Sequence, residues 1–460
     1  MSLIKSISGI RGTIGGKVNE NLTPLDVVKF TSAFGTWLQN NKNKKDLTLV
    51  VGRDARISGA MVNSLVTATL QGLGINVVDL GLSTTPTVEV MVPELNADGG
   101  IILTASHNPK QWNALKLLNE KGEFINGENG AEVLALAESE DFNYAEVDDL
   151  GKYETRDDAF DIHIQKILDL PTVDAEAIKS KKFKVVVDAV NSTGGIAIPR
   201  LLEELGCEVV KLYCEPNGQF PHNPEPLKEH LGDICELVKK ENADLGIVVD
   251  PDVDRLALVD ENGELFGEEY TLVAVADYLL KNKKGAAISN LSSSRALRDV
   301  ARNLDSEYFA SAVGEVNVVT LMKEKNAVIG GEGNGGIIYP DLHYGRDSLV
   351  GVALFLTHLA KEKKSVSELR ATYPSYFMGK KKIELTPDID VDALLTKMEN
   401  EYLNEEISTV DGVKIDFEKN WVHLRKSNTE PIIRIYTEAF SQEEADQLGD
   451  QMIEKIKSLV

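Results

Sequence analysis

The chain has 460 residues, of which 42% are hydrophobic and 27% are charged. At roughly 150 residues per domain, this length predicts about three or four globular domains, and the composition excludes a disordered or fibrous chain. The formal net charge of −24 argues against general binding to nucleic acid or anionic membranes, although a few arginines can still form a local anion site.

No apolar run approaches the ~20 residues needed to span a bilayer, and residues 1–16 lack the apolar segment of a signal peptide. The run 349–356 is shorter and predicts a buried helix. Cys207, Cys214 and Cys235 show no metal-ligand spacing, so we expect reduced, structural thiols. These features predict a cytoplasmic protein.

The first three-quarters of the chain alternates apolar strands with amphipathic helices, which is typical of an α/β fold. Thr23 and Pro24 are a strong helix start. The expected helices are 25–38, 61–73, 198–205, 227–240 and 296–303, and the expected strands are 47–51, 76–80, 100–103, 184–188, 208–212, 245–249, 286–291 and 327–329. The order restarts near residues 184 and 286, which indicates a weak internal repeat of organisation.

The last ~85 residues have strands in immediate succession, which predicts an antiparallel α+β domain. The expected strands are 381–385, 413–417, 421–424 and 432–436, with helices over 391–402 and 442–459. We therefore expect four domains: 1–153, 154–256, 257–373 and 374–460.

An aspartate loop follows the strand at 245–249. Asp250, Asp252 and Asp254 alternate, so in extended backbone their carboxylates lie on one side and can bind Mg²⁺ or Ca²⁺. An EF-hand is excluded because Arg255 stands where its loop needs glycine and because the flanks are strands. The nucleophile loop of a haloacid-dehalogenase-type phosphatase and a solvated acidic turn stay open as alternatives.

Two other loops also follow strands, where open α/β sheets bind their ligands. The loop 104–109 offers Ser106 as a nucleophile beside His107, although it lacks the Gly-x-Ser-x-Gly elbow and could be an ordinary turn. The glycine-rich loop 331–336 holds Glu332 and Asn334, which can hydrogen-bond sugar hydroxyls.

A fourth loop lies in the C-terminal domain. Arg425 and Arg434 flank the hydroxyls of Ser427 and Thr429, and such donor clustering in a strongly acidic chain indicates a phosphate cradle. The alternative is a basic β-turn.

These four loops, together with Ser8-Gly-Ile-Arg-Gly12, resemble in content and order the α-D-phosphohexomutase family of phosphoglucomutases, phosphomannomutases and phosphoglucosamine mutases. The resemblance covers essentially the whole chain. It implies three related α/β domains with mixed sheets and a fourth α+β domain around a central cleft. It also implies an isomerase that interconverts hexose 6-phosphate and hexose 1-phosphate through a phosphoserine and a 1,6-bisphosphate, which also serves as primer.

The resemblance implies a role for each matching residue. Ser106 would carry the phosphoryl group and, with the three aspartates, bind one Mg²⁺ per subunit. The implied catalytic residues are Ser106, Arg11, His107 and Lys116, the last as general base. The implied substrate-binding residues are Arg255, Glu332, Asn334, His343, Arg425, Ser427, Asn428, Thr429 and Arg434.

The sequence departs from the family pattern at a few positions. Gly336 stands where many members have histidine, with His343 as a substitute, and Ala114 and Pro251 replace common glycines. The loop 331–336 looks most like the phosphoglucosamine mutase branch, so we expect glucosamine phosphate as substrate. A phosphoglucomutase or phosphomannomutase, a Mg²⁺-dependent sugar phosphatase and a non-catalytic sugar-phosphate-binding protein are the alternatives. Oligomeric state stays open.

Overall fold

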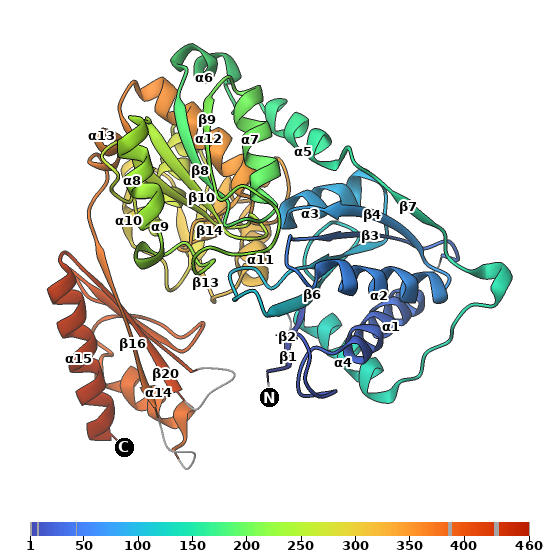
Figure 1. Ribbon diagram of the computed structural model, residues 1–460. Coiled ribbons are helices and arrows are strands. Elements are labelled where there is room, and N and C mark those ends of the chain that lie inside the picture. The colour runs from blue at the N-terminus through green and yellow to red at the C-terminus, as the bar shows by residue number, and fades with distance from the viewer. Residues whose placement is uncertain (1, 7–8, 43, 385–388, 427–431, 460) are drawn as a thin grey trace. The chain divides into compact units, whose positions relative to one another are not determined.

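The computed structural model describes residues 2–6, 9–42, 44–384, 389–426 and 432–459 (Figure 1). Contacts divide the chain into two compact units. The first unit contains Met1–Thr271 and Asn334–Arg370, and the second contains Leu272–Gly333 and Ala371–Val460. The four-domain division at residues 153, 256 and 373 stays a prediction. None of the described helices combines the length and apolar character needed to span a bilayer.

The N-terminal part of the first unit is built on a mixed seven-stranded sheet. Its strands, in spatial order, are β1 (Ile4–Ser6), β2 (Gly9–Thr13), β6 (Trp112–Leu118), β5 (Gly99–Leu103), β3 (Thr48–Arg53), β4 (Asn76–Leu82) and β7 (Tyr153–Thr155). β3 is parallel to β4 and β5, whereas β6 is antiparallel to β5 and β2.

Helices cover both faces of this sheet (Figure 1). One face packs against α1 (Pro24–Asn41), α2 (Gly59–Gly72) and α4 (Gly127–Ser139), and the other against α3 (Thr85–Glu94). Strand alternation explains the two layers: Leu49 faces the first group, and Val50 faces α3. The predicted start of α1 is confirmed, since Thr23 and Asp26 form a capping box.

A second mixed sheet in the first unit has the order β11 (Leu256–Asp260), β10 (Leu245–Val249), β8 (Lys184–Asp188) and β9 (Glu208–Leu212). β10 is parallel to β8 and antiparallel to β11. The helices of this region are α5 (Ala159–Leu168), α6 (Ala175–Lys181), α7 (Gly194–Glu204) and α8 (Gly232–Glu241), with 3₁₀ turns at Val147–Asp149 and Lys228–His230.

Two predicted helix starts in this region are wrong. The helix expected over 227–240 begins only at Gly232, because Leu231 (φ −108°, ψ 20°) separates it from the 3₁₀ turn. The helix expected from 198 begins at Gly194, because Pro199 lies inside α7 rather than in its first turn.

The third sheet has the order β13 (Tyr308–Ser311), β12 (Ala287–Asn290), β14 (Ile329–Glu332) and β15 (Gly336–Ile338), with β12 parallel to β13 and β14. The helices in this stretch of the chain are α9 (Glu268–Asn282), α10 (Ala296–Asn303), α11 (Glu315–Lys325), α12 (Ser348–Glu362) and α13 (Val366–Arg370). The prediction of a buried helix over 349–356 is confirmed by α12.

The C-terminal sheet is antiparallel throughout its described pairs, as predicted. Its strands lie in the order β16 (Phe377–Glu384), β20 (Ile432–Ala439), β19 (Trp421–Lys426), β18 (Val413–Asp416) and β17 (Glu406–Ser408). The helices α14 (Val391–Glu401) and α15 (Gln442–Leu459) complete its core. Three mixed α/β sheets and one antiparallel sheet agree with the expected fold class.

The predicted repeat of organisation is visible in the loops that connect neighbouring strands. In the first two sheets a buried strand, β5 or β10, continues through a loop into an antiparallel neighbour, β6 or β11. The Ser106 loop and the aspartate loop occupy these two equivalent connections. The glycine-rich loop similarly joins β14 to β15.

Candidate active site

The aspartate loop leaves β10 with its three carboxylates buried. Asp250, Asp252 and Asp254 are each 0% exposed, and one ligand atom from each lies within 4.8 Å of the others. The Oδ1 atoms of Asp252 and Asp254 have no hydrogen-bond partner among the described residues. Buried oxygens of this kind fit a hard divalent cation.

Ser106 lies directly against this carboxylate cluster. Its Oγ donates a hydrogen bond to Asp250 Oδ2 at 2.7 Å. Burial and then the charges of Asp254 and Asp252 raise the pKa of Asp250 well above its usual range. Three carboxylates at this spacing resist ionising together without a cation, so the electrostatics also favour a metal site.

Both loops hold a residue in the left-handed region of backbone conformation. Ser106 has φ 48° and Val253 has φ 66°, which is unusual for a β-branched residue. Strained backbone of this kind persists where surrounding contacts fix it, and it is concentrated at functional sites.

Arg56 supplies the contacts that fix the Ser106 loop, and sequence reasoning missed it. It is 1% exposed, and its Nε donates to Asp54 at 2.9 Å. Its two terminal nitrogens donate to four backbone carbonyls, those of Ser106, Asn108, Pro109 and Trp112. The sequence did contain a signal for Arg56: it lies shortly after β3, and functional residues in open α/β sheets are expected beyond the carboxyl ends of strands.

Lys116 is on β6 and reaches the aspartate loop. Its Nζ lies 2.8 Å from Asp252 Oδ2 and 3.6 Å from Asp254 Oδ2. Burial alone would lower the pKa of Lys116, but the adjacent Asp252 and Asp254 carboxylates raise it above its ordinary value. Arg11 on β2 pairs with Ala114, so it shares a sheet face with Lys116, two residues further along β6.

His107 and Arg255 flank the same cluster. His107 Nδ1 lies 3.4 Å from Ser106 Oγ, and burial, with the nearby Arg255 cation, lowers the pKa of His107 to about 3. His107 is therefore uncharged near neutral pH. The Arg255 side chain forms an ion pair with Glu225 at 3.2 Å.

The glycine at position 336 has a steric explanation. A Cβ there would lie 2.3 Å from Cδ of Arg346, whose guanidinium donates to Asp254 Oδ2 at 2.7 Å. Arg346 thus occupies the space into which a histidine at 336 would extend. Asn334 Oδ1 accepts the backbone N–H of Gly336 at 3.2 Å.

His343, expected to bind substrate, is surrounded by carboxylates. Its Nε2 lies 3.4 Å from Asp347 Oδ2, and its Nδ1 lies 3.4 Å from Glu89 Oε2. Its substrate role stays a prediction.

In the second unit, Glu332 is held at the end of β14. Its Oε1 accepts hydrogen bonds from Asn290 Nδ2 at 2.9 Å and from the backbone N–H of Gly314 at 3.2 Å. Glu332 is 6% exposed, so its carboxylate is fixed in place rather than free to move.

The C-terminal sheet carries a row of cations. Arg425 on β19 is paired in register with Arg434 on β20, which is paired in turn with Lys382 on β16. Residues directly opposite share a sheet face, and like charges there repel unless an anion separates them. Arg425 also forms an ion pair with Asp411 at 2.8 Å. The predicted ligands Ser427, Asn428 and Thr429 lie outside the described residues.

A buried histidine in this unit predicts acid sensitivity. His423 Nδ1 lies 2.9 Å from Ser292 Oγ, its Nε2 contacts the Asp411 carbonyl at 2.6 Å, and burial lowers the pKa of His423 to about 4. The unfolded chain takes up this proton near the ordinary value of 6.5, so stability falls as the pH drops from there toward 4. We expect a loss of about 1.4 kcal/mol per pH unit. The measurement is the Tm of wild type and of His423→Gln at several pH values. The difference between the two Tm values should shrink as the pH falls from about 7.5 to about 5. A difference that stays constant over this range would contradict the assignment of acid sensitivity to His423.

Models of known protein families match the chain in four consecutive segments. The segments are alpha/beta/alpha domain I (residues 4–144), domain II (161–263), domain III (267–376) and the C-terminal domain (380–455) of phosphoglucomutase/phosphomannomutase. The chain belongs to the phosphoglucomutase/phosphomannomutase family. It is a phosphohexomutase, which confirms the family resemblance.

Individual relatives agree on the family and differ in name. The chain is 39% identical to a phosphoglucomutase/phosphomannomutase of Thermococcus kodakarensis, covering 96% of this chain and 98% of that one. It is 33% identical to a probable phosphoglucosamine mutase of Methanopyrus kandleri, covering 98% and 97%. A crystal structure of a family member from Burkholderia thailandensis superposes with a TM-score of 0.86 at 26% identity, covering 99% and 98%.

Proposed function

We propose that this phosphohexomutase interconverts glucosamine 6-phosphate and glucosamine 1-phosphate through a phosphorylated Ser106. The observation that carries the mechanism is the 2.7 Å contact between Ser106 Oγ and Asp250 in a loop of three buried aspartates. A hydroxyl held against a cation site is suited to accept and release a phosphoryl group.

Asp250, Asp252 and Asp254 would hold one Mg²⁺ ion, with a phosphoserine oxygen as a further ligand. When bound, the ion would neutralise charge on the phosphoryl oxygens.

The chain's own residues position the reaction. Arg56 holds the Ser106 loop by its carbonyls, and Arg11 and His107 line the reacting centre. Transfer breaks the bond from phosphorus to Ser106 Oγ and forms one to the free sugar hydroxyl. The proton of that hydroxyl passes to Lys116 and, over the whole step, replaces the phosphoryl group on Ser106 Oγ. In the described state Lys116 is an ammonium ion beside Asp252, so it must release a proton before it acts as general base.

The resulting 1,6-bisphosphate turns end for end, and Ser106 takes back the other phosphoryl group. We assign sugar hydroxyls to Glu332 and Asn334, with Arg255 as a further ligand of the substrate. The phosphate that is not being transferred would bind Arg425 and Arg434, with Ser427, Asn428 and Thr429. The row of cations on the C-terminal sheet supports this assignment, because an intervening anion relieves its repulsion.

Glucosamine is proposed because the glycine-rich loop Gly331–Gly336 resembles that of the phosphoglucosamine mutase branch. Glucose or mannose phosphate is the second candidate, favoured by the name of the Thermococcus kodakarensis relative. The deciding experiment measures kcat/KM for the 1-phosphates of glucosamine, glucose, mannose and N-acetylglucosamine, each primed with its 1,6-bisphosphate. We expect glucosamine to lead, and a higher value for glucose or mannose would overturn the assignment. Release of inorganic phosphate with unmodified Ser106 would instead indicate the phosphatase.

Arg425→Ala should weaken substrate binding while leaving the phosphoserine intact. A charge-assisted contact to phosphate contributes about 1.5–3 kcal/mol, so we expect KM to rise about 10- to 150-fold. Arg425→Lys should recover part of this loss, because it keeps the charge but not the two-pronged geometry. Arg302→Ala, which removes an exposed arginine of α10, is the matched control. An unchanged KM with phosphate lost from Ser106 would place Arg425 in the chemical centre.

A further inference from the structure

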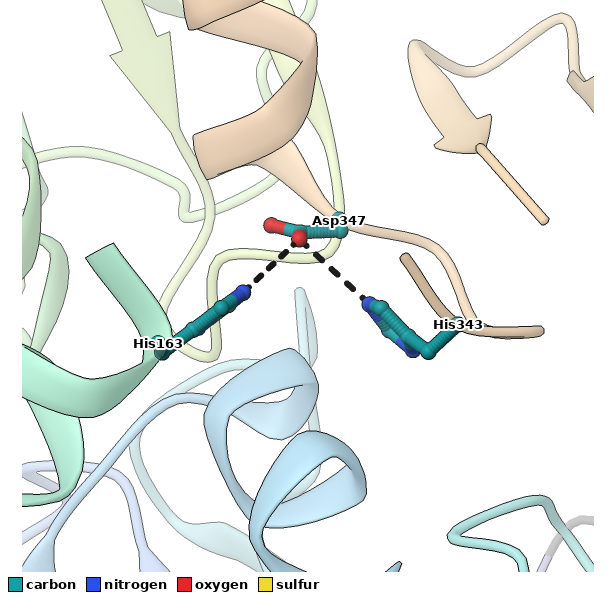
Figure 2. A group of neighbouring side chains, drawn as sticks. All are labelled: His163, His343 and Asp347. Atoms are coloured by element: carbon teal, nitrogen blue, oxygen red, sulfur yellow. Dashed lines mark hydrogen bonds and ion pairs between the residues drawn. The ribbon is translucent and has the colours of Figure 1, made fainter. Parts of the chain in front are cut away.

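A second cluster of buried ionisable groups lies in the first unit, outside the aspartate loop. It consists of His163 on α5, His343, and Asp347 at the start of α12 (Figure 2). The side chains of His163 and Asp347 are 0% exposed and that of His343 is 7% exposed. The phosphohexomutase reaction proposed above gives no role to His163 or Asp347.

The two imidazoles point at the same carboxylate oxygen. Figure 2 shows His163 and His343 on either side of Asp347, and their Nε2 atoms lie 3.0 Å and 3.4 Å from its Oδ2. Ligands at about 2.0–2.1 Å from a tetrahedral ion are about 3.3–3.4 Å apart, so the 3.4 Å contact matches that spacing and the 3.0 Å contact would lengthen slightly on binding. The three ligand atoms all lie within 4.8 Å of one another.

The other carboxylate oxygen of Asp347 caps the helix that follows it. Oδ1 accepts the backbone N–H groups of Leu349 and Val350 at 2.8 Å and 3.3 Å and thereby caps α12. The carboxylate is therefore held in one orientation by the helix, and this orientation presents Oδ2 to the two histidines.

The outer nitrogens of both rings also have oxygen neighbours. Nδ1 of His163 lies within hydrogen-bond distance of Thr87 Oγ1, at 3.0 Å. Nδ1 of His343 lies 3.4 Å from Glu89 Oε2, an ion-pair distance without a formed hydrogen bond. Both oxygens can accept a hydrogen bond from Nδ1–H, and that tautomer turns the lone pair of Nε2 toward the cluster. Metal-binding histidines are typically oriented by such outer partners.

A neutral His343 cannot satisfy both of its carboxylate neighbours by itself. One neutral imidazole carries one ring proton, so either Asp347 or Glu89 would face a lone pair. Either a second ring proton or a bound metal ion at Nε2 removes this conflict. With the ion, Nδ1–H donates to Glu89 while Nε2 and Asp347 share the metal.

We propose that His163 Nε2, His343 Nε2 and Asp347 Oδ2 bind one divalent transition-metal ion of the zinc class, with water completing the tetrahedron. Imidazole nitrogen suits Zn²⁺, whereas Mg²⁺ prefers the all-oxygen aspartate loop, so ligand chemistry separates the two sites.

Two segments of the chain contact both the histidine cluster and the aspartate loop. In the first turn of α3, Thr85 Oγ1 donates to Asp252 at 2.6 Å, and Thr87 contacts His163 two residues later. In the segment before α12, Arg346 binds Asp254 and the adjacent Asp347 belongs to the cluster. An ion in this site would therefore fix two segments that position Asp252 and Asp254.

The test uses the full chain, stripped of metal and then saturated with Mg²⁺ to occupy the aspartate loop. Titration with Co²⁺ should give the visible absorption of four-coordinate Co²⁺, saturating at one equivalent per chain and abolished by Zn²⁺. His163→Gln should weaken Co²⁺ binding at least about 100-fold, and Thr87→Val about 10-fold through the outer shell. Absence of the absorption, or unchanged binding in His163→Gln, would overturn the proposal.

His222→Gln is the matched control, because His222 contacts Asp188 at the same 3.0 Å but, among the residues that the structure describes, no second imidazole joins this pair. Its Co²⁺ affinity should equal that of wild type. Should His163→Gln fail to fold, X-ray absorption of the Zn²⁺-loaded wild type decides the question. Two imidazoles in the coordination shell support the site, and fewer than two overturn it.

Discussion

Ser106→Ala should abolish mutase turnover and remove the phosphoryl group from the protein. Ser106 is the proposed acceptor, and its Oγ contacts Asp250 at 2.7 Å. Alanine leaves no atom to carry phosphate, so we expect kcat to fall by more than about 10⁴-fold, as for other enzymes that lose a nucleophile. Intact mass spectrometry of wild type after incubation with a 1,6-bisphosphate should show a species heavier by about 80 Da that the variant lacks.

The matched control is Ser64→Ala on α2, whose hydroxyl contacts only the Ala60 carbonyl among described residues. It should keep both the added mass and full activity. Substantial turnover in Ser106→Ala, or an added mass that persists there, would contradict the phosphoserine mechanism.

Asp252→Asn should have the second-largest effect, on both metal affinity and turnover. It replaces one of three buried carboxylates, so the cation loses a charged ligand and Lys116 loses its partner at 2.8 Å. We expect kcat to fall at least about 10²-fold. Chelation of wild type by EDTA should give the same loss, and added Mg²⁺ should restore activity to wild type but not to the variant.

Asp79→Asn provides a control for the loss of a buried carboxylate. Asp79 is 4% exposed, but it contacts Asn63 and Tyr153 rather than the aspartate loop. The Asp79→Asn enzyme should lose activity in EDTA and regain it with Mg²⁺, as wild type does. A wild-type enzyme indifferent to the chelator would leave the aspartates as a structural turn.

The sequence allowed much of the site to be predicted, because strand ends can be read from local pattern. Ser106 and Asp250 are far apart in the chain, yet each follows an apolar strand, and the rule that ligands bind beyond strand ends brings them together. Lys116 was found only through the family resemblance, and its contact with Asp252 depends on β6 lying beside β5.

The contacts of Arg56, Thr85 and Arg346 could not be predicted from local pattern. Each side chain reaches its partner through packing between segments about 50 or more residues apart, and a single sequence carries no record of such packing. The helix starts at Gly194 and Gly232 were missed for a local reason: a proline or an apolar residue near a helix end leaves its first turn ambiguous.

The close approach of Arg346 to Gly336 couples the residues at these two positions. With Arg346 in place, any side chain at 336 would meet its Cδ, so a histidine there requires Arg346 to move or to be replaced. Either change would take the guanidinium away from Asp254, which is buried and accepts its hydrogen bond. The absence of a side chain at 336 is therefore a steric condition for keeping an arginine beside the aspartate loop.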